Sequence, residues 1–116
     1  MSEQRRDDPE PRLLHLLEPD EQLHVAARAR DAYLAVTDRR VVVMEEGRIA
    51  LDIGFDELRR IQFDVEADRP ATLVIVPESA LDEPQVLAIP ADAMKRTTEA
   101  LAVIGARLAL RAQRTR

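Results

Sequence analysis

The spacing of the hydrophobic residues changes along this chain, and the change limits the fold more than any other feature of the sequence. Between about residues 23 and 89, short segments alternate apolar with polar side chains, a period typical of half-buried β-strands. From about residue 91 the apolar residues recur every three to four positions, which predicts an amphipathic helix to about residue 112. We therefore expect a mainly β domain with a helix at its C-terminal end.

The clearest turn in the β region lies within residues 33–44. Two stretches rich in β-branched residues flank Asp38 and Arg39, a pattern that predicts a β-hairpin. With a two-residue loop, four apolar residues would share one face of the hairpin: Leu34, Val36, Val41 and Val43. Asp-Arg is not a favoured pair for a two-residue loop, so a longer loop with another register is the alternative.

The same reading predicts seven strands in all. They span residues 23–30, the two arms of the 33–44 hairpin, 48–53, 60–66, 72–76 and 86–89, and a short helix over 11–17 precedes them. Residues 55–58 are expected to form one helical turn that places Phe55 and Leu58 in the core. Alternation also assigns to the core face Leu23 in the first strand, Ile49 in the fourth and Val65 in the fifth.

Size and composition exclude several classes of protein. With 116 residues the chain forms one domain, for which we expect a disordered tail over 1–10, a single folded unit over 11–112 and a basic tail over 113–116. The absence of cysteine excludes disulfides and thiolate zinc sites.

The charge is unevenly distributed along the chain. The net charge is −5, of which residues 91–116 contribute +4 and the remainder −9. The acidic body and the aromatic content of 3% both argue against nucleic-acid binding. The charged N-terminus lacks the apolar core of a signal peptide and no segment is long enough to span a membrane, so we expect a cytoplasmic protein.

The residues that could carry chemistry are few. His15 and His24 have no cysteine and no obvious histidine partner nearby in sequence, which argues against a metal site. Acid–base work by Asp52, Asp56 or Glu57 would need a desolvated carboxyl group, whereas their positions predict a solvent-facing strand and a turn cap. The two serines lie in polar loops, and no Gly-x-Ser-x-Gly motif occurs. We expect no catalytic, cofactor or metal site, and therefore no enzyme.

Three segments carry a resemblance to a known family. Residues 17–21 (Leu-Glu-Pro-Asp-Glu) resemble the L-x-P-x-E entry of bacterial pleckstrin-homology (PH)-like domains, and residues 34–40 (Leu-Ala-Val-Thr-Asp-Arg-Arg) are similar to the hydrophobic-Thr-Asp-x-Arg hairpin that these share with GRAM domains. Residues 55–61 resemble their short turn into the fifth strand. The resemblance covers about residues 12–110. It implies a bent, partly open barrel of two sheets closed at one end by the C-terminal helix, and a non-enzymatic binding or assembly module that forms homo-oligomers in several bacterial members.

The best-known activity of that superfold does not carry over to this chain. Phosphoinositide-binding PH domains place lysines and arginines around the loop that joins the first two strands. Here the loop is short, Arg30-Asp31-Ala32, and only Arg28 and Arg30 are basic near it. Asp31 would lie between them and any bound phosphate, so a phosphoinositide ligand is not indicated.

The C-terminal helix is the best candidate for a functional surface. Its core stripe is Met94, Leu101, Ile104 and Leu108, with Thr97 or Thr98 in the remaining turn. A second apolar stripe follows another face: Ala100, Val103, Ala106 and Leu110. Since a surface helix needs only one apolar stripe, the second predicts an interface with a protein partner, including a second copy of the chain. The alternative is that alanine is neutral on a surface and only Val103 and Leu110 need explaining.

Two other binding modes remain open from the sequence. The basic end of the helix could contact anionic lipid as a peripheral membrane module, through Arg107, Arg111, Arg114 and Arg116. An open sheet edge could take up a strand from a partner, and the barrel mouth could take a small ligand, but the sequence names no residue for either. Protein–protein contact is our first prediction and lipid contact the alternative.

Overall fold

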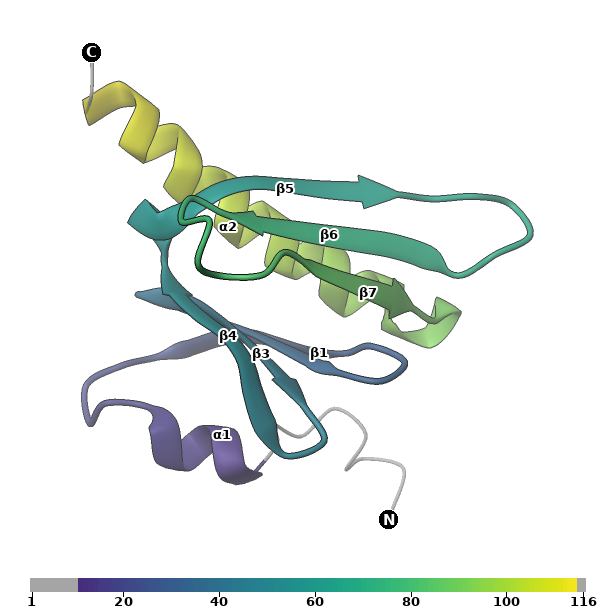
Figure 1. Cartoon of the computed structure of the whole chain (residues 1–116), viewed down its shortest axis with the longest axis horizontal. Helices are drawn as coiled ribbons and strands as arrows, with labels where there is room; N and C mark the ends of the chain where they lie inside the picture. Colours follow the sequence, from purple (N-terminus) through teal and green to yellow (C-terminus); the bar gives the residue numbers. More distant parts are fainter. Residues whose placement is uncertain (1–10, 115–116) are drawn as a thin grey trace.

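The computed structural model describes residues 11–114 and consists of seven strands and a long C-terminal helix (Figure 1). The expected tail over residues 1–10 lies outside the described residues. In order, the elements are α1 (Pro11–Leu16), β1 (Leu23–Arg28), β2 (Tyr33–Thr37), β3 (Arg40–Glu45), β4 (Arg48–Gly54), the 3₁₀ turn η2 (Phe55–Glu57), β5 (Leu58–Asp64), β6 (Ala71–Pro77), β7 (Gln85–Ile89), the 3₁₀ turn η3 (Ala91–Ala93) and α2 (Met94–Arg114).

The strands form two antiparallel sheets, β1-β2-β3-β4 and β5-β6-β7. The chain just after β1 reaches the second sheet, because the Arg30 amide donates a hydrogen bond to the Ala88 carbonyl of β7 over 2.8 Å. Helix α2 packs over β1 and β2 and against η2, so that it closes the space between the sheets (Figure 1). The predicted architecture of seven antiparallel strands capped by a C-terminal helix is confirmed. No helix within residues 11–114 is both long and apolar enough to cross a bilayer.

The predicted hairpin lies at the centre of the first sheet. Strand β2 ends at Thr37 and β3 begins at Arg40, so the loop is the two-residue Asp38-Arg39. Leu34 pairs with Val43 and Val36 with Val41, which confirms the expected register. All four side chains are at most 1% exposed and join one core with residues of the second sheet and α2.

The opposite face of the first sheet is buried as well. There Leu13 of α1 is fully buried against a second hydrophobic cluster that contains Tyr33, Ala35, Val42 and Met44. Strands β2 and β3 are therefore covered on both faces, by α1 on one side and by the main core on the other. This explains why their sequences are apolar without clear alternation.

Three residues assigned to the core by simple alternation lie elsewhere, and those predictions were wrong. A register shift between Leu23 and Val25 turns Leu23 away from the main core, and it packs against the second cluster instead. A shift in the β3–β4 pairing leaves Ile49 43% exposed. Val65 follows the end of β5 and is 63% exposed. Bulges and strand ends break the period of two without changing the residue types.

Helix α2 contacts the core mainly through small and medium side chains. Thr97 and Ile104 are fully buried, so Thr97 occupies the open turn of the predicted stripe. Ala100 is only 1% exposed and belongs to the core, which corrects its assignment to an outer apolar stripe. At Gly105 an added Cβ would meet no atom within 4 Å, so this glycine does not mark a close approach to the sheet.

Candidate functional site

A buried polar cluster, defined by Glu21, Thr37 and Arg40, lies where β1 begins and the β2–β3 turn ends. The Glu21 side chain is fully buried, and both of its oxygens accept hydrogen bonds from neighbouring groups. Oε2 accepts from Thr37 Oγ1 at 2.6 Å and from Arg40 Nε at 2.9 Å. Oε1 accepts from Arg40 Nη2 and from the Glu18 amide, each at 3.0 Å. Each carboxylate oxygen of Glu21 therefore accepts two charge-assisted hydrogen bonds.

The electrostatics of the cluster are those of a structural ion pair. The hydrogen bond from Arg40, helped by the one from Thr37, lowers the pKa of Glu21 from 4.5 to about 2 against the opposing effect of burial. The same carboxylate raises the pKa of Arg40. Arg40 also donates to Asp52 Oδ2 at 2.9 Å and to the Leu16 carbonyl at 2.7 Å. The cluster therefore fastens α1, β1, β3 and β4 together and presents no free reactive group.

Sequence reasoning did not single out Glu21 and Arg40. Both belong to the segments that carry the family resemblance, residues 17–21 and 34–40, which was the available signal. Asp38 of the second segment joins the same junction, because it exchanges hydrogen bonds with the Gln22 backbone. The two segments are therefore the halves of one structural junction.

The other residues considered for chemistry lie apart from one another. His15 and His24 are both exposed. Asp52 is paired with Arg40, and Glu57 accepts a hydrogen bond at 2.8 Å from the Gly54 amide, which caps η2. Within residues 11–114, no three His, Cys, Asp or Glu side chains are grouped in a way that could hold a metal ion.

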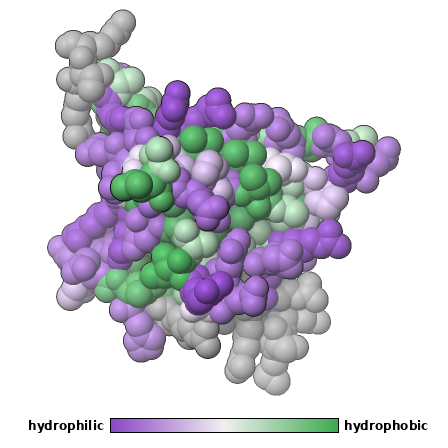
Figure 2. Space-filling view, viewed as in Figure 1, coloured by the Kyte–Doolittle hydropathy of each residue, from purple (hydrophilic) through white to green (hydrophobic). Residues whose placement is uncertain are grey.

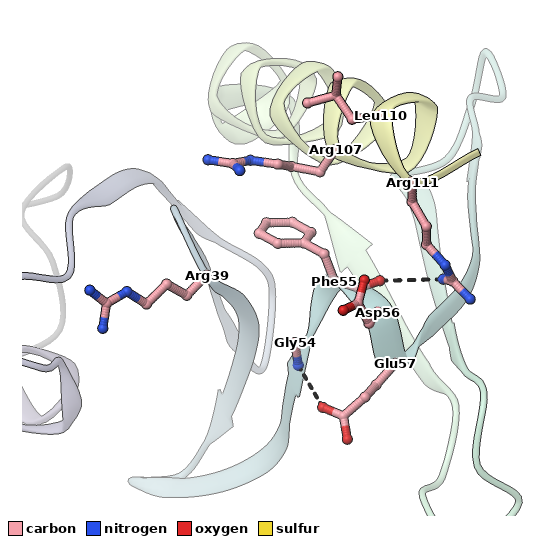
Figure 3. Close-up of a pocket in the computed structure, with 8 residues that line it drawn as sticks. All are labelled: Arg39, Gly54, Phe55, Asp56, Glu57, Arg107, Leu110 and Arg111. Carbon is pink, nitrogen blue, oxygen red and sulfur yellow. Dashed lines mark hydrogen bonds between the residues drawn. The ribbon is translucent and has the colours of Figure 1, made fainter. Parts of the chain in front are cut away.

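A groove of about 460 Å³ lies between η2, the β2–β3 turn and the C-terminal half of α2 (Figure 3). We call it the η2–α2 groove. Its lining residues are Arg39, Gly54, Phe55, Asp56, Glu57, Arg107, Leu110 and Arg111. Three of these, Arg107, Leu110 and Arg111, are residues that the sequence proposed as contact residues, and the fold brings them to one place.

The groove combines an apolar floor with guanidinium groups. The Phe55 ring is 9% exposed, and the guanidinium carbon of Arg107 lies 5.6 Å from the ring centroid. Figure 3 shows Arg107 above the ring and Arg39 to one side of it. Leu110 remains 47% exposed at the helix surface. The lining also contains two carboxylates, Asp56 and Glu57, while Arg39 is paired with Asp20 and Arg111 with Glu78. Such a site can accept an apolar side chain through burial against Phe55 and Leu110.

Arg111 is engaged by its own chain, which argues against the predicted contact with an external anion or lipid. Its Nη1 donates to the Leu58 carbonyl at 2.8 Å and to the Phe55 carbonyl at 3.4 Å. Its Nη2 pairs with Glu78 at 3.0 Å. Arg111 thereby fastens the C-terminal half of α2 to η2 and to the β6–β7 loop. The side chain of Arg114 and the whole of Arg116 lie outside the described part of the structure.

The predicted second stripe of α2 divides into two parts. Ala100 belongs to the core and Val103 is half-buried against it, whereas Ala106 and Leu110 are exposed. The exposed part adjoins the groove, since Leu110 lines it. A surface here consists of the last turns of α2 together with η2.

A second apolar surface is the outer face of the β5–β7 sheet. Figure 2, from the same side as Figure 1, shows apolar residues gathered over these strands between polar ones. In these strands Val74 and Val76 are half-buried, and Val86, which pairs with Val74, is 66% exposed. This face carries cross-strand valine contacts that also suit a solvated sheet.

Comparison with solved structures identifies the fold. The crystal structure of a pleckstrin homology domain from Shewanella amazonensis SB2B superposes with a TM-score of 0.52, over 68% of this chain and 78% of that chain. This chain has a pleckstrin-homology fold. At 17% identity the likeness shows the PH-like fold alone. No known family matches the sequence, and a search of curated proteins finds no match either.

The β1–β2 side of this PH-like fold offers little positive charge. A recess of about 310 Å³ lies there, lined by Arg30 and by four apolar residues: Pro70, Ala88, Pro90 and Ala91. One guanidinium is a sparse match to a multiply phosphorylated headgroup. The η2–α2 groove, where the Phe55 ring, Arg107 and the exposed Leu110 meet, is the better candidate for a binding site.

Proposed function

We propose that this PH-like domain is a non-enzymatic binding module that acts through protein–protein contacts at the η2–α2 groove. The observation that supports it is the half-exposed Leu110 beside a floor made of Phe55 and Arg107. Aromatic residues and arginine are enriched in protein interfaces and dominate their binding energy. A partner that covers Leu110 would exclude water from a site already shaped by the fold.

The structural roles of the buried and capping charged residues support the same proposal. Glu21, Arg40 and Asp52 form one hydrogen-bonded junction, and Glu57 caps η2. These carboxylates serve the fold, which argues against acid–base catalysis by them. Lipid contact is the weaker reading, because Arg111 bonds to Leu58 and Glu78 and the chain outside residues 91–116 has a net charge of −9.

The test is a pull-down with the purified chain from cells that encode it, with three versions compared. We expect a protein that the wild type and Val65→Glu retain and that Leu110→Glu loses, because burying a glutamate in the contact is unfavourable. Val65 is a matched control, since it is 63% exposed and does not line the groove. Circular dichroism of each variant would check that it is folded.

Two results would count against the proposal. If Leu110→Glu and Phe55→Ala retain the same proteins as the wild type, the groove is not the binding surface. If the chain instead sediments with anionic vesicles at low salt, and Arg107→Glu abolishes the binding, the lipid reading replaces it.

A further inference from the structure

Strand β7 forms one edge of the second sheet and lacks the charged side chains that usually protect such an edge. Its residues, Gln85–Ile89, carry no charge, whereas each of the other edge strands, β1, β4 and β5, carries at least one charged residue. Charged side chains hinder the pairing of an edge strand with a further strand, because pairing would remove them from water. Of these four edges, β7 is therefore the one best suited to accept another strand.

One side of the β7 backbone does not face β6. The Ala88 carbonyl accepts a hydrogen bond from the Arg30 amide at 2.8 Å, so the backbone groups of Ala88 point away from β6. Residues two apart on a strand point the same way, and Val86 therefore also directs its N–H and C=O away from β6. Within residues 11–114, neither of these two Val86 groups takes part in a hydrogen bond.

A hollow of about 500 Å³ lies beside this free edge, between the start of β7 and the β3–β4 turn. We call it the β4–β7 hollow. Ile49 on one wall is 43% exposed, and Val86 on the other is 66% exposed. A chain segment that entered the hollow would remove both side chains from water, which is favourable. The full lining is Glu45, Arg48, Ile49, Ala50, Glu83, Pro84, Gln85 and Val86.

The charges around the hollow are mostly negative. Two carboxylates, Glu45 and Glu83, and one guanidinium, Arg48, line it, and Glu46 and Asp82 adjoin them in the chain. In the part of the chain that the structure describes, none of these five side chains forms a salt bridge. Four carboxylates against one guanidinium favour a basic segment over an acidic one. A second copy would bring the same acidic surface to its partner, which disfavours the pairing of two β7 edges.

We propose that β7 takes up an extended, basic segment of a partner protein as an added strand, which pairs with the backbone of Val86. Strand addition gains its affinity from main-chain hydrogen bonds and its specificity from the pockets that receive alternate side chains. Because Arg30 already occupies the Ala88 carbonyl, the added strand is short and centred on Val86. This site is separate from the η2–α2 groove, so the proposal goes beyond the function proposed for that groove and can fail independently of it.

The surroundings of Val86 specify the sequence that the segment should have. Side chains on an added strand point alternately to the two faces of the sheet. Those that point inwards contact Ile49 and Ala50, and should be apolar. A lysine or arginine in the same segment can pair with Glu45 or Glu83. The expected segment therefore alternates apolar, β-branched residues with others and contains at least one basic residue.

Panning of short random peptides displayed on phage tests this against the whole chain. We expect the wild type to enrich apolar, basic sequences without acidic residues. The Val86→Pro variant should not enrich them, because proline removes the outward N–H, while the β6 pairing uses the backbone of Gln85 and Leu87. Val86→Thr is the matched control, since it keeps both the branched shape and the N–H. Circular dichroism would check that both variants are folded.

Nuclear magnetic resonance with a synthetic peptide of the enriched sequence gives a measurement that needs no variant. Binding should slow the hydrogen exchange of the Val86 amide, because this N–H becomes hydrogen-bonded in the complex. We expect Val86→Pro to weaken the affinity about tenfold or more and Val86→Thr to leave it within about twofold. Glutamine at both Glu45 and Glu83 should weaken it several-fold and reduce its dependence on salt. Leu110→Glu, in the η2–α2 groove, should have no effect.

Three outcomes would overturn the inference. The first is that panning enriches no sequence, or enriches acidic ones. The second is a selected peptide that leaves the exchange of the Val86 amide unchanged or that loses its affinity in Leu110→Glu, which would assign it to the η2–α2 groove and leave the function proposed there standing. The third is self-association of the wild type that Val86→Pro abolishes, because the occupant of the β7 edge would then be a second copy.

Discussion

Replacing Glu21 with glutamine tests the central structural claim, that a buried ion pair fastens the entry segment to the hairpin. The change keeps the size of the side chain but removes the charge that faces Arg40 Nε at 2.9 Å and Nη2 at 3.0 Å. Removing one partner of a buried pair costs about 3–5 kcal/mol. Arg40 keeps its bonds to Asp52 and Leu16, so we expect the lower end of that range, about 3 kcal/mol at pH 7.

The pH dependence of stability gives a second estimate of the same quantity. The pKa of Glu21 falls from 4.5 to about 2 on folding, and such a shift corresponds to about 3 kcal/mol. Because the folded value is the lower one, this stabilisation is complete above pH 4.5 and is lost as the pH falls towards 2. The free-energy gap between wild type and Glu21→Gln should therefore be widest near neutral pH and shrink in acid.

Urea unfolding followed by far-UV circular dichroism measures the gap, since the chain has no tryptophan. Glu66→Gln serves as control, because its carboxylate is 61% exposed and lies 3.6 Å from Arg69. We expect that variant to stay within about 0.5 kcal/mol of the wild type. A gap for Glu21→Gln below about 0.5 kcal/mol at pH 7, or one that does not change with pH, would refute the reasoning.

Three further substitutions in α2 test its packing. Gly105→Ala should raise stability by about 1 kcal/mol, measured as a higher Tm, since an added Cβ meets no atom within 4 Å; a lower Tm would show a hidden contact. Ile104→Ala should cost about 2–4 kcal/mol in urea unfolding because this side chain is fully buried, and a loss below about 1 kcal/mol would contradict its core position. Arg111→Gln should speed amide hydrogen exchange in residues 105–114 by breaking the bond to Leu58, whereas unchanged exchange would show that this bond does not hold the helix end.

Most of the fold follows from local patterns in the sequence. The hairpin loop at Asp38-Arg39, the short strands between residues 23 and 89 and the helical period after residue 91 are all set by neighbours a few positions apart. The errors at Leu23 and Ile49 come from bulges, which shift the register by one residue and leave no mark in residue type. The continuous apolar runs of β2 and β3 are consistent with burial on both faces, but the element that covers the second face depends on where α1 packs.

The candidate site could be predicted only in part, for a related reason. Arg107 and Leu110 stand out on a helical wheel, and Phe55 stands out as an aromatic residue in a short turn. That the three meet in one groove depends on how α2 crosses the sheets. Arg111 looked like a free cation because its acceptor, the Leu58 carbonyl, lies 53 residues away in the chain. Contacts at that separation have no local signature.

The location of the family resemblance also explains why it identifies the fold but not the ligand. Residues 17–21 and 34–40 supply Glu21 and Arg40. These two side chains pair with each other, and they also form hydrogen bonds with Thr37 and with the backbone. A motif whose polar groups are largely satisfied internally constrains the chain path more than it recognises a partner. Of these two segments, Arg39 lines the η2–α2 groove. Binding must then depend mainly on residues outside them, and the groove beside Leu110 is the place where mutations should change partners without changing the fold.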